Sequence, residues 1–64
     1  MKGFIFVHDK SWKNRLTAIK VKSIMSIAET LDHNALITYG NDITLETGEC
    51  FTDVLRVIDT EVRK

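Results

Sequence analysis

The sequence predicts a small α+β protein, in which a curved, mostly antiparallel sheet of about five strands carries one C-terminal α-helix packed on it. Short segments rich in β-branched and aromatic side chains follow one another and are separated by turn residues. After residue 50 the hydrophobic period changes from two residues to three or four, which indicates a helix. A chain of 64 residues has room for one domain. Residues 1–64 are therefore expected to form a single α+β domain.

The first predicted strand is apolar on both faces. Phe4 and Phe6 alternate there with Ile5 and Val7. A short strand of this kind is buried on both sides, or one side meets another subunit. The predicted strands cover residues 3–8, 15–21, 24–29, 36–39 and 43–47.

The connections between these strands contain typical turn residues. A bend, bulge or single helical turn is expected near residues 21–23, because one unbroken strand over residues 15–30 would be unusually long. The alternative, a continuous helix over residues 16–31, is disfavoured by the many β-branched residues. Asp and Asn in residues 30–34 suit a tight turn. Gly and Asn in residues 40–42 supply the positive φ angles of a hairpin turn.

The C-terminal segment has the spacing of an amphipathic helix. Gly48 is expected to end the last strand, and either Thr47 or Cys50 then caps the helix. The apolar positions follow the intervals i, i+3, i+4, i+7 and i+11 and predict the face that packs on the sheet. This face consists of Phe51, Val54, Leu55, Ile58 and Val62.

The net charge is zero, but its distribution along the chain is uneven. Residues 1–22 contain six basic side chains and one acidic side chain, whereas residues 23–64 contain three basic and eight acidic ones. In one interpretation the two halves attract each other within the fold. In the other, a basic edge faces an acidic partner or nucleic acid.

The composition also indicates in which cellular compartment the protein is found. Cys50 is the single cysteine, which excludes an intramolecular disulfide and fits a reducing compartment. No secretory signal is visible, and no stretch approaches the roughly 20 apolar residues of a membrane span. The expectation is a soluble cytoplasmic protein without a membrane partner.

The sequence contains candidate chemical groups but no catalytic constellation. Cys50 is either a thiolate activated at a helix N-terminus or a small residue at the strand-to-helix junction. His8 beside Asp9, and His33 beside Asp32, are either acid/base pairs or turn residues. The histidines and the cysteine lack zinc-ligand spacing, so neither a metal nor another cofactor is expected. We therefore expect a non-enzymatic protein-interaction or regulatory module, which binds an unknown protein partner or self-associates as a homodimer.

The alternative function is nucleic-acid binding by the basic segment of residues 10–22. An aromatic side chain flanked by cations is typical of proteins that bind single strands with little sequence preference. The neutral total charge and the single aromatic residue weaken this interpretation. The candidate contacts to a partner or to nucleic acid are Lys10, Trp12, Lys13, Arg15, Lys20 and Lys22.

Three blocks of the sequence match motifs of a known family: residues 24–27 (IMSI), 37–42 (ITYGND) and 49–54 (ECFTDV). They resemble a strand start, a strand with its turn, and a helix start in the FlbD-like (swarming-motility SwrD-like) family of small bacterial proteins. The resemblance implies a small cytoplasmic accessory protein with no known catalysis. It does not imply a role in a flagellum, because such a fold is separable from that role.

The sequence departs from the family pattern at three positions. Asp42 stands where the family has glycine in the turn, and Lys20 stands where asparagine is usual near the end of a strand. Cys50 replaces a serine that would cap the helix, and a thiol is a poorer acceptor for the N–H groups at the helix start. Each motif is a structural signal, so the resemblance concerns the fold more than a site.

Overall fold

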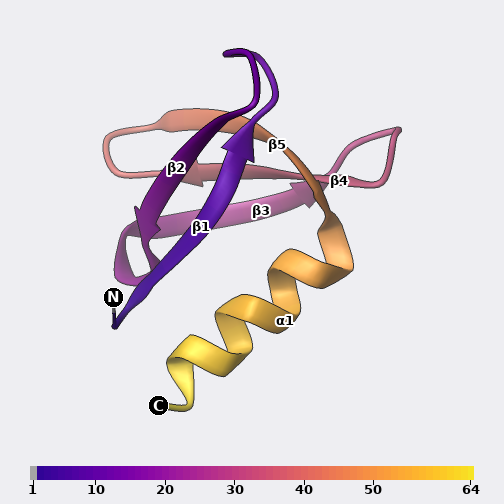
Figure 1. The fold of residues 1–64 in the computed structure, drawn as a ribbon. Coiled ribbons are helices and arrows are strands. Elements are labelled where there is room, and N and C mark those ends of the chain that lie inside the picture. Colours follow the sequence, from indigo (N-terminus) through magenta and orange to yellow (C-terminus); the bar gives the residue numbers. More distant parts are fainter. Residues whose placement is uncertain (1) are drawn as a thin grey trace.

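The structure, a computed structural model, describes residues 2–64 and confirms the predicted α+β class. One five-stranded antiparallel sheet, which is not closed into a barrel, is followed by one α-helix (Figure 1). The strand order is β2-β1-β5-β4-β3, so β2 and β3 form the two edges. The elements are β1 (Phe4–Asp9), β2 (Arg15–Lys20), the 3₁₀ turn η1 (Val21–Ser23), β3 (Ile24–Glu29), β4 (Asn34–Tyr39), β5 (Ile43–Cys50) and α1 (Phe51–Val62).

The sheet divides into two parts that cross each other. β1 pairs with β2 along its whole length, but it pairs with β5 only where Asp9 lies opposite Thr47. The β1–β2 hairpin therefore swings away from the β3-β4-β5 part, and Figure 1 shows it crossing over those strands. The helix α1 packs against β1, β4, β5 and η1 and covers the space that this divergence leaves.

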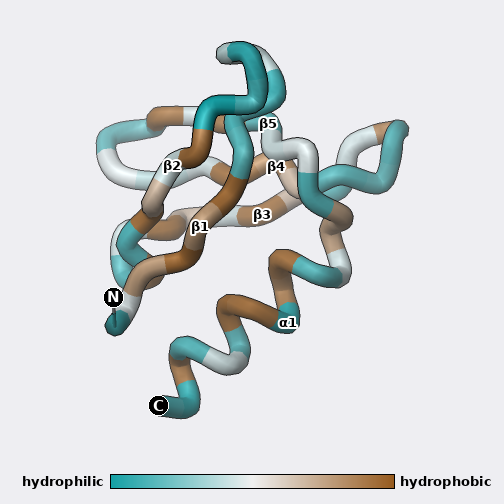
Figure 2. The backbone as a smooth tube through the Cα atoms, viewed as in Figure 1, coloured by the Kyte–Doolittle hydropathy of each residue, from teal (hydrophilic) through white to brown (hydrophobic). Residues whose placement is uncertain are grey.

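The core lies between the two parts of the sheet and the helix. Alternate residues of each strand face it, as a half-buried sheet requires. Figure 2 shows hydrophobic residues along β1, β4 and α1, whereas the loop between β1 and β2 is largely hydrophilic. The buried hydrophobic side chains are Ile5, Val7, Ile19, Ala35, Ile37, Leu45 and Val54.

The first strand is buried on one face only. Ile5 and Val7 belong to the core, while Phe4 is half-buried and Phe6 is 50% exposed on the opposite face. Full burial on both faces, one of the two expectations for this strand, is therefore wrong. The reason is that α1 and the remaining strands cover only the inner side of the β1–β2 hairpin.

The predicted helix is confirmed, but its predicted contact face is only partly right. Phe51, Val54 and Ile58 pack into or against the core. Leu55 is 41% exposed and Val62 is 67% exposed, contrary to the prediction. The sheet approaches α1 from one side and covers a stripe at i, i+3 and i+7, which is narrower than the apolar stripe of the sequence.

Five strand boundaries differ from the prediction: both ends of β1 lie one residue later, β2 ends one residue earlier, β4 begins at Asn34 and β5 ends at Cys50. β2 ends at Lys20, because Val21, the last residue of the predicted strand, begins the turn η1. β5 continues through Gly48 to Cys50, because a register shift in its pairing with β4 lets Asn34 pair with Cys50. Gly48 is thus accommodated by an irregularity of the ladder and does not end the strand.

Candidate functional site: a lysine-lined pocket

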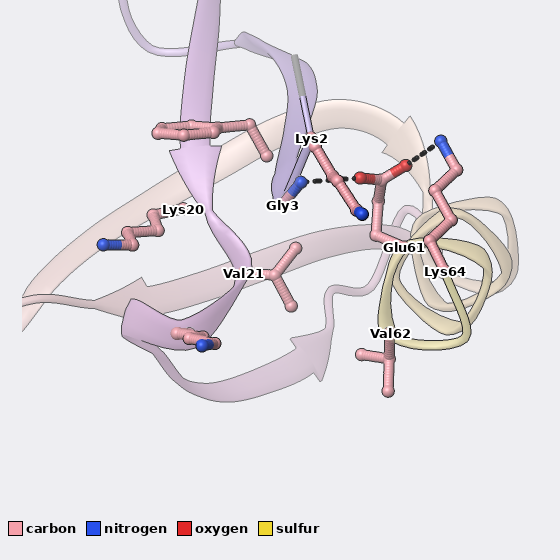
Figure 3. A pocket seen from close by; sticks show the side chains of 9 residues that line it. Lys2, Gly3, Lys20, Val21, Glu61, Val62 and Lys64 are labelled. Atoms are coloured by element: carbon pink, nitrogen blue, oxygen red, sulfur yellow. Dashed lines mark hydrogen bonds and ion pairs between the residues drawn. The ribbon is translucent and has the colours of Figure 1, made fainter.

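A pocket of about 520 Å³ lies at the end of the sheet where the first and last residues of the described chain meet. The start of β1, the turn η1 and the last turn of α1 form its walls (Figure 3). The pocket is lined by Lys2, Gly3, Phe4, Lys20, Val21, Lys22, Glu61, Val62 and Lys64.

Local backbone structure brings these walls together. Gly3 adopts a φ of +83°, a conformation that glycine adopts without steric cost. Its carbonyl accepts a hydrogen bond of 2.9 Å from the N–H of Val21, which fixes η1 beside the beginning of β1. Val21 and Val62 (Figure 3) form an apolar lining, to which Phe4 also belongs.

Glu61 closes the pocket on the helix side. Its carboxylate accepts a hydrogen bond of 2.9 Å from the backbone N–H of Gly3, and it forms an ion pair of 2.7 Å with Lys64. Its side chain is only 10% exposed. The hydrogen bond from Lys64, and then that from Gly3, lower the pKa of Glu61 below its ordinary value of 4.5. Glu61 is therefore ionised and engaged within the wall.

The lysines of the pocket outnumber its acidic groups. Four lysines and one glutamate line it, which leaves a formal excess of three positive charges. Within residues 2–64, no acidic side chain lies within ion-pair distance of Lys2, Lys20 or Lys22. Unpaired cations around an apolar concavity attract an anionic group that also carries apolar surface.

The six residues predicted to act together are divided between two places. Lys20 and Lys22 line the pocket. Trp12, Lys13 and the start of β2 at Arg15 lie at the opposite end of the β1–β2 hairpin, about 17 Å away along an extended strand. The predicted basic segment is thus not one continuous surface.

Lys10 has a different environment from the other five. Its ammonium group lies 3.4 Å from Asp32 and 3.6 Å from Glu46. The charge of Lys10 is therefore paired with acidic residues of the second half of the chain. This agrees with the interpretation that the two halves attract each other within the fold.

The tip of the β1–β2 hairpin exposes an aromatic ring beside a cation. Trp12 is 61% exposed, and the guanidinium carbon of Arg15 lies 5.4 Å from the centre of its ring. Lys13 and Asn14 both have positive φ angles, and the N–H of Arg15 donates to the carbonyl of Trp12 at 3.0 Å. This is the geometry of a β-turn with positive φ at both central positions, and it ends the five-residue connection, residues 10–14, between β1 and β2.

Sequence reasoning missed most of the pocket. Of its lysines, Lys2 and Lys64 were not predicted, and neither was the role of Glu61. The hydrogen bond between Gly3 and Glu61 joins residues 58 positions apart. No periodicity or motif of the sequence connects the two ends of the chain, because only the packing of α1 along β1 brings them together.

The other candidate groups have local partners. His8 Nδ1 lies 2.6 Å from the Glu49 carboxylate, and His33 Nδ1 lies 3.0 Å from that of Glu29. The Asp9 carboxylate accepts hydrogen bonds from the backbone N–H and hydroxyl of Ser11, as in a turn. Among the residues that the structure describes, no three histidine, cysteine or acidic side chains are placed to hold a metal ion.

Cys50 is exposed at the start of α1. The hydroxyl of Thr52 lies 3.3 Å from its sulfur. This hydrogen bond lowers the pKa of the Cys50 thiol below its ordinary value of 9.0, and the backbone N–H groups of Thr52 and Asp53 add to the effect. In the part of the chain described, no histidine nitrogen hydrogen-bonds the sulfur.

No helix within residues 2–64 combines the length and the apolar character needed to cross a membrane. A scan of the sequence against models of known protein families gives no match. Searches of curated proteins and of solved structures likewise give no match.

Proposed function

We propose that this chain is a small non-catalytic protein-interaction module whose lysine-lined pocket binds an acidic segment of another protein. The observation that supports this proposal is the group Lys2, Lys20 and Lys22 around an apolar lining, with no acidic partner among residues 2–64. Each of the three ammonium groups is free to donate hydrogen bonds to a ligand carboxylate.

The chemistry of the lining favours a carboxylate next to an apolar side chain. Lysine presents a compact charge that suits a single carboxylate, whereas planar recognition of a nucleobase relies on arginine or exposed aromatic rings. Val21 and Val62 supply apolar surface between the lysines. An aspartate or glutamate next to a leucine or valine in an extended segment matches both features.

The pocket is also well placed to recruit such a partner. The acidic residues Asp32 and Glu46 are engaged with Lys10 near the other end of the β1–β2 hairpin. Their charge therefore does not neutralise the pocket lysines directly. A concentrated positive potential in a concave site increases the association rate of acidic partners.

Membership of the FlbD-like family is part of this proposal. The residues that resemble the family motifs lie in the sheet and at the start of the helix, at residues 24–27, 37–42 and 49–54. A cytoplasmic accessory role without catalysis agrees with a module that acts by binding.

The proposal is tested by calorimetric titration with short peptides. A peptide of alternating Glu and Leu should bind with an affinity that falls as salt rises, and the same peptide with Gln in place of Glu should bind at least tenfold more weakly. Backbone amide signals of Gly3, Val21 and Val62 should shift during the titration. Equal binding of the Glu and Gln peptides would contradict the proposal.

A matched pair of variants separates the pocket from total charge. Lys2→Glu together with Lys20→Glu should weaken binding of the Glu peptide about tenfold or more. Lys13→Glu with Arg15→Glu changes the net charge equally but at the hairpin tip, and it should have a small effect. An equal loss in both double variants would show that only long-range attraction is involved.

A second candidate function is nucleic-acid binding by the hairpin tip. It is favoured by the exposed ring of Trp12 beside the guanidinium group of Arg15 and by the ammonium group of Lys13, which has no ion-pair partner among residues 2–64. A base stacking on the open face of the ring would quench the fluorescence of Trp12, the single tryptophan. Absence of salt-sensitive quenching by mixed oligonucleotides would exclude this function.

A further inference from the structure

The two edges of the sheet differ in the charges at their ends. The edge strand β2 begins at Arg15 and ends at Lys20, so it is basic at both ends. The edge strand β3 follows Lys22 and ends at Glu29, and Asp32 comes shortly after it. β3 is therefore basic at its beginning and acidic at its end.

The hydrogen-bonding groups of β3 that face away from β4 can be identified. The N–H of Thr30 donates to the carbonyl of Asn34 at 2.9 Å, so the backbone N–H of Thr30 points towards β4. Bonded and non-bonded pairs alternate along an antiparallel ladder. The residues Ile27 and Glu29 thus belong to non-bonded pairs with β4, and their N–H and C=O groups point to the free edge.

β3 has little of the protection that isolated sheet edges usually have. Charged side chains, proline and bulges are the devices that prevent edge-to-edge pairing. The residues from Ile24 to Ala28 contain no charge and no proline. The single register shift lies between Ile24 and Ser26, at the beginning of the strand, and it leaves the rest of β3 regular.

We propose that β3 pairs with β3 of a second copy of this chain, in an antiparallel arrangement about a two-fold axis near Ile27. In this arrangement the outward N–H and C=O groups of Ile27 and Glu29 bond to the second copy. A two-fold contact uses the same strand in both copies, so it closes as a dimer and leaves β2 as the outer edge.

Charge complementarity selects β3 over β2 for this contact. Antiparallel self-pairing of β3 near Ile27 brings Lys22, which precedes the strand, towards Asp32, which follows the strand in the second copy. The same contact occurs twice because of the symmetry. Antiparallel self-pairing of β2 would instead bring Arg15 alongside Lys20 of the second copy, and like charges in such positions destabilise the pairing.

Additional surface is covered by the same contact. Ile27 is half-buried in the single chain, and Met25 is 61% exposed. Both lie on the paired segment, and the Ile27 side chains of the two copies meet next to the axis. The interface of two short strands is small, so a dimer with a dissociation constant in the micromolar range is expected.

Sedimentation over a range of concentrations tests the dimer with the full chain. Lys22→Glu and Asp32→Lys should each raise the dimer dissociation constant about tenfold, because each brings like charges together at both ends of the pairing. The double variant, Lys22→Glu with Asp32→Lys, should restore the original constant. These residues lie at opposite ends of β3 within one chain, so restoration requires a contact between copies.

A control and a second measurement complete the test. Lys13→Glu has the same charge change as Lys22→Glu but lies at the hairpin tip, and it should leave dimerisation unchanged. Hydrogen exchange of the Ile27 and Glu29 amides should slow as the concentration rises, while the amides of β2 stay unaffected. A monomer at all concentrations, growth beyond a dimer, or a double variant as weak as the single variants would overturn the proposal.

Discussion

The Glu61 carboxylate accepts a hydrogen bond of 2.9 Å from the backbone N–H of Gly3. This bond fastens the last turn of α1 to the residue before β1. It also holds the one acidic side chain of the pocket in the wall, where Lys64 is its second partner. The same interaction therefore contributes to the fold and to the charge of the candidate site.

Glu61→Gln should reduce the stability of the protein at neutral pH and much less in acid. The pKa of Glu61 is lower in the folded chain than its ordinary value of 4.5. Its contribution is therefore complete above that ordinary value and is lost as pH falls through the folded pKa. Urea denaturation of both proteins at several pH values measures this difference. A difference in the free energy of unfolding that did not depend on pH would show that the ionised carboxylate is not involved.

Ile37→Ala should be far more destabilising than Leu55→Ala. Ile37 is fully buried in β4, and its truncation should lower the free energy of unfolding by about 2–5 kcal/mol. Leu55 is 41% exposed, so its truncation should cost less than about 1 kcal/mol. Thermal or urea denaturation measures both values. If Leu55→Ala were the more harmful change, α1 would be rotated from the orientation described above.

Thr47→Val should destabilise the sheet where its two parts meet. Thr47 is completely buried, and its hydroxyl donates a hydrogen bond of 2.9 Å to the carbonyl of Ala35. Valine has a similar shape but leaves that carbonyl without this donor, at a cost of about 1–3 kcal/mol. Thr44→Val, at an exposed position of the same strand, is the control and should be nearly neutral. Urea denaturation of both variants provides the comparison.

The alkylation rate of Cys50 should depend on the hydroxyl of Thr52. The Thr52 hydrogen bond is the largest cause of the lowered thiol pKa of Cys50. The rate of reaction with iodoacetamide, followed against pH, should therefore rise at lower pH than for a free model thiol. Thr52→Val should move this rise to higher pH. An unchanged pH profile would assign the lowered pKa to the helix N-terminus alone.

Most of the local structure was predictable because it depends on neighbouring residues. The hairpin turn at residues 40–42 has Gly40 at positive φ as predicted, but the second positive φ is at Asp42 and not at Asn41. The helix begins at Phe51, where the hydrophobic period changes. The turn η1 formed where an unbroken strand would have been too long. Each of these features is specified within about ten residues of sequence.

The orientation of α1 was less predictable. The sequence indicated a broad apolar stripe, but it did not show that only the side with Val54 and Ile58 meets the sheet. The continuation of β5 through Gly48 was missed for a similar reason. It depends on a register shift against β4, which is a property of the pair of strands and not of one segment.

The sequence by itself determined the class of fold, the number of strands, the helix and the uneven distribution of charge, because these follow from local composition and periodicity. Only the tertiary structure decided that Lys20 and Lys22 lie with Lys2 and Lys64 around a pocket, while Trp12 and Arg15 lie at the other end of β2. The physical reason is that a strand separates its two ends by its length. Contacts between the start of β1 and the end of α1 arise only when the helix packs on the core.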